Sequence, residues 1–123
     1  MTDSNNAHLV IMWVFGPEEA AQVDEIFASH GTWMTGHPKD GDEALLRYSI
    51  SKGPELENPL DPASAPTGNT VVVLDEVYAT PAGIPRHWQD AVANWPDLAR
   101  VMEVSKNASV TTLHSGTIIQ QLW

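Results

Sequence analysis

Residues 71–88 read VVVLDEVYATPAGIPRHW, and this stretch decides the fold. A run of β-branched and apolar residues is typical of a buried strand, and it leads through Glu76-Val77-Tyr78 into a proline-marked helix start. Because alternate residues of a strand share one face, Glu76 and Tyr78 point to the same side. The helix start carries His87 and Trp88. One strand-to-helix corner thus holds an acid, a phenol, an imidazole and an indole.

The hydrophobic pattern on either side predicts three more strands and a second helix. The expected strands cover residues 8–15, 43–51, 69–79 and 110–123. The expected helices cover residues 16–31, where Gly31 is a plausible stop, and 84–95, with another turn or two over 97–103. Residues 52–68 contain four prolines, and we expect a loop excursion between strands two and three. A single domain over residues 1–123 accounts for this length.

The order β-α-β-β-α-β predicts a ferredoxin-like α+β fold, an antiparallel four-stranded sheet with two helices on one face. The strands at 8–15 and 69–79 are apolar on both sides, so the second face of the sheet also needs cover. A second copy of the same sheet provides that cover by two-fold symmetry. We therefore expect a homodimer with the form of a dimeric α/β barrel.

The charge balance restricts the partners. Sixteen acids against six bases give a net charge of −10, which disfavours nucleic acid and anionic membrane surfaces. No apolar run approaches the roughly 18 residues of a membrane span. The first residues lack a signal-peptide pattern, so we expect a cytoplasmic protein. The absence of cysteine excludes disulfides, thiolate catalysis and cysteine-based metal sites.

The candidate catalytic residues are His87, Glu76 and Tyr78. An imidazole has an unperturbed pKa near neutrality, so His87 is suited to general acid–base work. Glu76 on the adjoining strand is placed to hold that imidazole, and Tyr78 to donate to a developing oxyanion. Alternatively, His87 is a core histidine that orders the corner, and Glu76 makes an intersubunit or helix-capping bond.

The candidate substrate-binding residues are aromatic. Trp33 and Trp88 flank histidines and suit the flat walls of a pocket, with His30, His37 and His114 beside them; core packing is the alternative for each. No two histidines have the i, i+4 spacing of paired ligands on a helix. We therefore expect no metal and no other cofactor.

The corner also resembles a known family. An apolar strand, Glu76-Val77-Tyr78, a short turn and His87 nine residues after the tyrosine are similar to the dimeric α/β-barrel superfamily, antibiotic-biosynthesis-monooxygenase-like branch. Residues 31–38 and the long connection before strand three depart from that pattern. The resemblance implies a cofactor-independent monooxygenase acting on a small aromatic or polyketide-like substrate in a dry cavity between sheet and helices. An isomerase or cyclase on the same fold, or a non-catalytic small-molecule-binding or stress-type dimer, are the alternatives.

Overall fold

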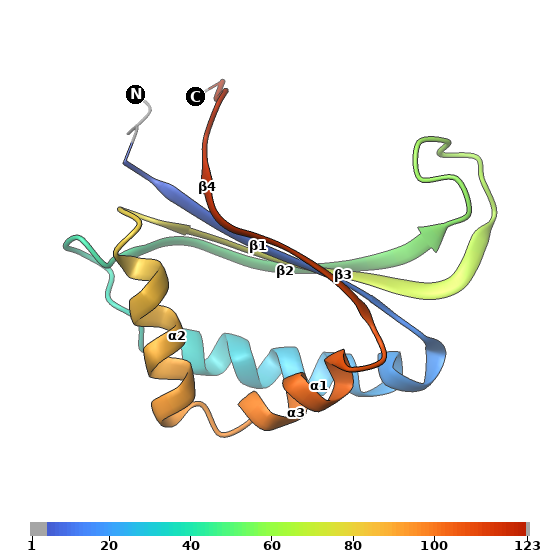
Figure 1. Ribbon diagram of the computed structural model, residues 1–123, viewed down its shortest axis with the longest axis horizontal. Coiled ribbons are helices and arrows are strands. Elements are labelled where there is room, and N and C mark those ends of the chain that lie inside the picture. The colour runs from blue at the N-terminus through green and yellow to red at the C-terminus, as the bar shows by residue number, and fades with distance from the viewer. Residues whose placement is uncertain (1–4, 123) are drawn as a thin grey trace.

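The chain folds into one sheet with its helices packed on one side. The computed structural model describes residues 5–122. In chain order the elements are β1 (Ala7–Phe15), α1 (Pro17–Met34), β2 (Leu45–Leu56), β3 (Pro66–Tyr78), α2 (Gly83–Asn94), α3 (Leu98–Ser105) and β4 (Ser109–Thr117). Figure 1 shows the sheet as one layer and the three helices as the other, with both ends of the chain on the same side. The ferredoxin-like α+β architecture predicted from the sequence is confirmed.

The sheet has the strand order β2-β3-β1-β4, and the described pairs are all antiparallel. The two central strands carry the core because alternate residues face the helices. On β1 these are Leu9, Ile11 and Trp13, each at most 5% exposed. Their partners across the ladder include Glu76 and Leu74 on β3. Glu76 is therefore part of the buried, helix-facing side of a central strand.

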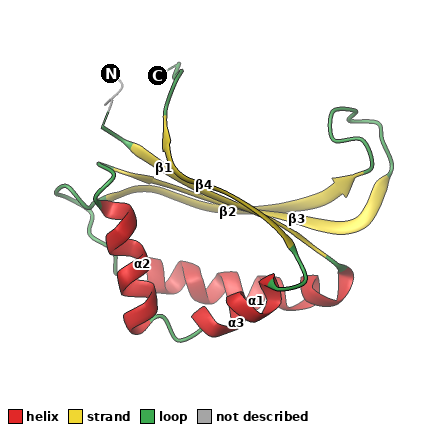
Figure 2. Ribbon diagram, viewed as in Figure 1, coloured by secondary structure: helices red, strands yellow, loops and turns green. Residues whose placement is uncertain are grey.

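The helices cover this face of the sheet (Figure 2). Gly16 caps α1, Pro17 begins it, and Glu18 and Glu19 lie in its first turn, as the sequence predicts. The predicted stop at Gly31 is wrong, since α1 continues to Met34. A Cβ at Gly31 would lie 3.7 Å from the Tyr48 hydroxyl, an ordinary van der Waals contact, so the helix packs against β2 at this point. Tertiary packing here outweighs the weak helix propensity of glycine.

The two-helix expectation also needs correction. Residues 98–105 form a separate helix, α3, because Trp95 has an extended backbone (φ −88°, ψ 111°) before Pro96. Two hydrogen bonds hold this turn to α1. Trp95 Nε1 donates to Ser29 Oγ (3.2 Å), and Ser29 Oγ donates to Asp97 Oδ2 (2.5 Å). The corner between α2 and α3 is thus fixed against the C-terminal half of α1.

The proline-rich segment 52–68 is about half strand, since its two ends belong to β2 and β3. Strand β2 runs to Leu56 and β3 begins at Pro66, so only residues 57–65 lie outside the ladder. Pro54 is tolerated because β2 is an edge strand, and Pro66 because it is the first residue of β3. The two strands form a long hairpin that extends past the helices in Figure 1.

The last strand is shorter than predicted. Strand β4 ends at Thr117, and residues 118–122 are irregular. Gly116 sits where a Cβ would lie 2.5 Å from a methyl group of Leu113, so the strand bends tightly near its end. Trp123 lies outside the described residues. In the described part of the chain, every helix is too short or too polar to cross a membrane.

The start of α2 generates a test of the corner. A Cβ at Gly83 would lie 2.4 Å from Cδ1 of Tyr78, which is fully buried. We expect Gly83→Ala to lower the free energy of unfolding by about 1–3 kcal/mol, because Tyr78 has no space in which to move. Gly53→Ala on β2 is the control, since nothing lies within 4 Å of that Cβ position. Equal urea-denaturation midpoints for the two variants would contradict this packing.

Candidate functional site

Three histidines from different segments meet beneath β3. His30 comes from α1, His37 from the turn after α1, and His87 from α2; each is at most 7% exposed. His37 Nε2 and His87 Nδ1 share a hydrogen bond of 3.1 Å. The rings of His30 and His87 are 5.8 Å apart and meet edge to face. The structure therefore answers a question that the sequence leaves open, because both early histidines lie near His87.

A carboxyl group completes the cluster. Glu76 is fully buried on β3, and its Oε1 accepts a hydrogen bond of 2.5 Å from the Tyr78 hydroxyl. The same oxygen lies 3.8 Å from His87 Nδ1. Glu76 Oε2 has no hydrogen-bond partner among the described residues. The phenol that the sequence offers as an oxyanion donor is thus directed at Glu76.

Tyr48 also belongs to the cluster, although sequence analysis did not identify it as a candidate site residue. It lies on β2 opposite Glu76, and its hydroxyl shares a hydrogen bond of 2.7 Å with His30 Nδ1. The two rings are also stacked. The only indication in the sequence was that Tyr48 lies on the inner face of strand two. Its contact with His30 depends on how α1 crosses the sheet.

Burial sets the charge states of the cluster. Desolvation, together with the neighbouring His37, lowers the pKa of His30 to about 4. Desolvation, His30 and His37 lower the pKa of His87 to about 3. Desolvation raises the pKa of Glu76 to about 7, against the opposing hydrogen bond from Tyr78. At neutral pH the two rings are therefore uncharged, with nitrogen lone pairs available.

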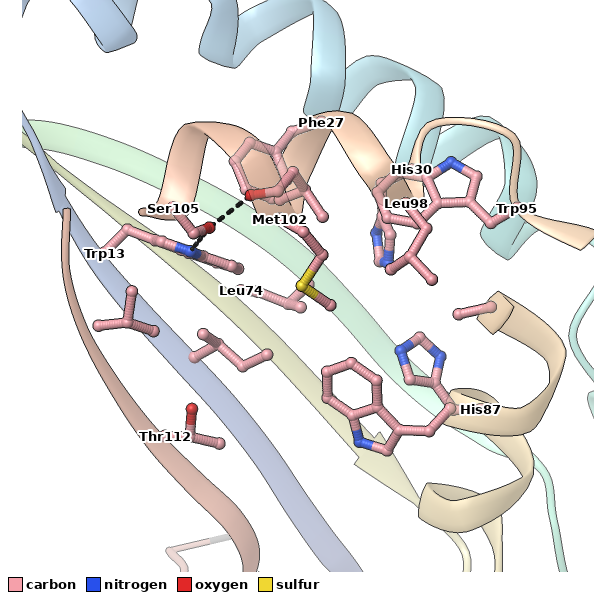
Figure 3. A pocket seen from close by; sticks show the side chains of 15 residues that line it. Trp13, Phe27, His30, Leu74, His87, Trp95, Leu98, Met102, Ser105 and Thr112 are labelled. Atoms are coloured by element: carbon pink, nitrogen blue, oxygen red, sulfur yellow. Dashed lines mark hydrogen bonds between the residues drawn. The ribbon is translucent and has the colours of Figure 1, made fainter. Parts of the chain in front are cut away.

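A largely apolar cavity of about 180 Å³ begins at this cluster. It lies between the sheet and the helices, with Trp13, Phe27, Trp88 and Trp95 among its walls. Its polar side chains, besides the indole nitrogens, are His30, His87, Ser105 and Thr112. Figure 3 shows His30 and His87 at one end and the Trp13–Ser105 hydrogen bond (2.9 Å) toward the other. The site is thus a largely apolar cavity with two imidazoles at one end.

The remaining candidates have different places. Trp88 lines the cavity, whereas Trp33 packs against His87 from outside the lining, with its Nε1 bonded to Asn94. His37 stands behind His87 and is not among the lining residues. His114 is exposed on β4 and stacks on Trp88. Trp13 and Trp95, which belong to the hydrophobic core, also line the cavity.

Comparisons with known proteins identify the fold. A solved structure of a dimeric ferredoxin-like protein from an uncultured marine organism aligns with a TM-score of 0.63, covering 95% of this chain and 98% of that one. The two sequences are 11% identical, so the likeness shows the fold alone. The chain is a ferredoxin-like α+β protein. No protein-family model matches it.

Sequence similarity extends to part of a much longer protein. Over 91 residues, or 72% of this chain, it is 32% identical to the DNA mismatch repair protein MutL of Vibrio parahaemolyticus. It is 34% identical over 91 residues to the MutL protein of Pasteurella multocida. The chain spans only 13% and 14% of the length of these curated relatives.

The buried cluster generates a pH test of stability. The unfolded chain binds protons at both histidines below pH 6.5, whereas folded His30 and His87 bind them only near pH 4 and 3. Both histidines therefore reduce stability as the pH falls. Folded Glu76, with its pKa raised from 4.5 to about 7, opposes them over that interval. The net effect of these three groups is a loss of stability of roughly 1 kcal/mol per pH unit between about pH 6 and pH 5, and burial of His37, which also lowers its pKa, acts in the same direction.

Urea denaturation at fixed protein concentration checks this balance. Glu76→Gln removes the opposing group, so we expect its stability to fall more steeply with acid than that of the parent. His87→Gln removes one of the two histidines, so we expect a shallower fall. Parallel pH profiles for all three proteins would contradict the charge states assigned to the cluster.

Proposed function

We propose that this protein is a homodimeric enzyme that binds a small, flat, largely apolar molecule in the cavity and transfers a proton at its histidine end. The observation that carries the proposal is the largely apolar cavity ending on two buried, uncharged imidazoles. Uncharged histidines at the end of a cavity can accept a proton, while the apolar walls exclude water. Perturbed titrating groups in a pocket are characteristic of functional sites.

The size of the cavity narrows the substrate class. A cavity of about 150 Å³ lined by apolar side chains accommodates benzene. The volume here, about 180 Å³, therefore suits one aromatic ring with small substituents, not a multi-ring polyketide. Trp88 and Trp95 offer flat surfaces against which such a ring can stack. A hydroxyl or carbonyl group on the ring would then meet His30 and His87.

The residues have distinct roles in this scheme. His30 and His87 both line the cavity, and we assign the proton transfer to His87 because Glu76 lies beside it and, when ionised, raises its proton affinity. Glu76, 3.8 Å from His87 Nδ1, stabilises the positive charge that His87 then carries. Tyr78 holds Glu76, and His37 holds the His87 ring. Glu76, Tyr78 and His37 are therefore positioning residues rather than groups that touch the substrate.

The resemblance suggests a cofactor-independent oxygenation as the reaction. A cyclic enone, or a phenol in its keto tautomer, has a ring methylene group that would lose one proton to His87, and the resulting carbanion would form a C–O bond with molecular oxygen. The peroxide would take the proton back, and loss of water would leave a carbonyl group. The methylene group is oxidised and O₂ is reduced, giving one carbonyl group and one water. Isomerisation or cyclisation would use the same proton transfer without O₂.

Oxygen uptake with a panel of single-ring phenols and cyclic enones tests the chemistry. For a substrate that the parent oxidises, we expect His87→Gln to lower kcat about 10²- to 10⁴-fold, the usual contribution of a general base. Gln89→Ala, an exposed neighbour on α2, is the control and should retain the parent rate. Turnover by His87→Gln at the parent rate would remove His87 from the mechanism. If the parent and both variants bind a panel compound but none of them oxidises it, the result would favour the non-catalytic alternative.

The dimer is proposed on the exposed sheet face. Val10, Met12 and Val14 on β1 point away from the helices, as do Val71 and Val73 on β3. Met12 is 39% exposed at the centre of this apolar surface. The structural neighbour is described as dimeric. A second copy of the sheet is the occupant that covers this face with matching apolar side chains.

Sedimentation equilibrium tests this assembly. We expect a dimer for the parent and a monomer, or a dimer weakened on the order of 100-fold, for Met12→Glu, because two carboxylates would face an apolar interface. Val92→Glu introduces the same charge on the exposed side of α2, where the side chain is 76% exposed, and should leave the dimer intact. A monomeric parent at micromolar concentration would contradict the proposal.

A further inference from the structure

We infer that His30, Glu76 and His87 form a binding site for one divalent transition-metal ion. The three side chains are buried, and each offers a ligand atom within 4.8 Å of the others. Two imidazoles and one carboxylate are the donor set of catalytic zinc sites and of non-haem iron(II) sites. Those sites keep an open coordination position for water or substrate.

The three ligands converge from separate elements. His30 lies in the last turns of α1, Glu76 at the inner face of β3 and His87 in the first turns of α2. A metal about 2.0–2.2 Å from each donor needs ligand atoms about 3–3.6 Å apart. The separations here, at most 4.8 Å, therefore have to shorten by roughly 1–2 Å when a metal binds. The fold therefore brings the three side chains close together, and movement of these side chains would complete the coordination.

An independent observation points to a ligand at Glu76. Its Oε2 is buried and has no hydrogen-bond partner among the described residues. A buried carboxyl oxygen left unsatisfied destabilises the fold, so such atoms are rare without a function. Tyr78 fixes the other oxygen, Oε1. The carboxyl group is thus held by one oxygen while the second is free to coordinate.

The surrounding hydrogen bonds resemble those that support metal-bound histidines. Ligating imidazoles almost always use their second nitrogen to donate to a neighbouring acceptor, which fixes the ring. Tyr48 occupies Nδ1 of His30, and His37 occupies Nδ1 of His87. Among the described residues, no hydrogen bond engages Nε2 of either ring. Tyr48, Tyr78 and His37 therefore act as the outer shell of the proposed site.

The proposed metal would face the cavity. His30 and His87 both line it, and Figure 3 shows their rings at the same end. A ring hydroxyl or carbonyl oxygen bound there could occupy the open coordination position. This substrate assignment rests on the proposed function, whereas metal binding itself does not. With the metal bound, His87 is a ligand, and its role as proton acceptor belongs to the metal-free protein.

Cobalt(II) is the probe, because its visible absorption reports coordination by protein ligands. Full-length protein is freed of metal with a chelator and titrated with CoCl₂, then with ZnCl₂ in competition. We expect one ion per chain, a visible band typical of four or five ligands, and displacement by zinc. Glu76→Gln and His30→Gln should weaken binding on the order of 100-fold, since even outer-shell partners contribute about 10- to 100-fold.

Two controls make the result specific. His8→Gln removes the histidine of the His8–Asp75 pair on the opposite sheet face and should bind cobalt as the parent does. Circular dichroism establishes that each variant is folded. If Glu76→Gln does not fold, X-ray absorption of the cobalt-loaded parent replaces it, with two imidazoles and a carboxylate expected. A parent that binds no cobalt below about 100 μM, or equal affinity in folded Glu76→Gln, overturns the inference.

The outcomes separate this inference from the proposed function. Oxygen uptake by chelator-treated protein that binds no metal would uphold the proposed function and overturn the metal site. Stoichiometric metal binding without turnover of any panel compound would uphold the metal site and count against the proposed function.

Discussion

The burial of Glu76 is the constraint on which the site depends. A carboxyl group without any exposure on a central strand is destabilising unless its oxygens are satisfied. Tyr78 satisfies one oxygen, and the close approach of Gly83 holds the Tyr78 ring in place. His87 then comes within 3.8 Å of the same oxygen because α2 begins directly beneath Tyr78. The strand-to-helix corner is thus a unit built around one acid.

The cavity follows from the same arrangement. Helix α2 leaves the sheet at the corner, and the turn at Trp95 directs α3 back along it. The space between these helices and the sheet is lined by indole and phenyl rings, which are too stiff to collapse into it. Ser105 and Trp13 join α3 to β1 at the end of this space away from the histidines. A rigid frame therefore keeps a single-ring chamber open beside the polar cluster.

Much of this architecture could be predicted from local patterns. The apolar run of β3 predicted the strand. The two-residue spacing of Glu76 and Tyr78 predicted that both side chains lie on one face of it, next to the strand-to-helix corner. The parts that failed depend on contacts between distant segments. Gly31 was predicted as a stop because its packing beside Tyr48 is not visible in the sequence, and Pro54 was predicted as loop because the edge position of β2 is not visible either. His30 and His37 meet His87 because of the path that α1 takes across the sheet, and residue spacing in the sequence does not predict that path.

The central claim is that the cavity receives a small ring whose polar group meets the His30–Glu76–His87 end. A crystal structure of the protein soaked with phenol tests it most directly. The account predicts a phenol ring between the tryptophan walls, with its oxygen within hydrogen-bonding or metal-ligand distance of His30 or His87. An empty cavity at saturating phenol, or a ring bound with its hydroxyl directed away from both histidines, would contradict it.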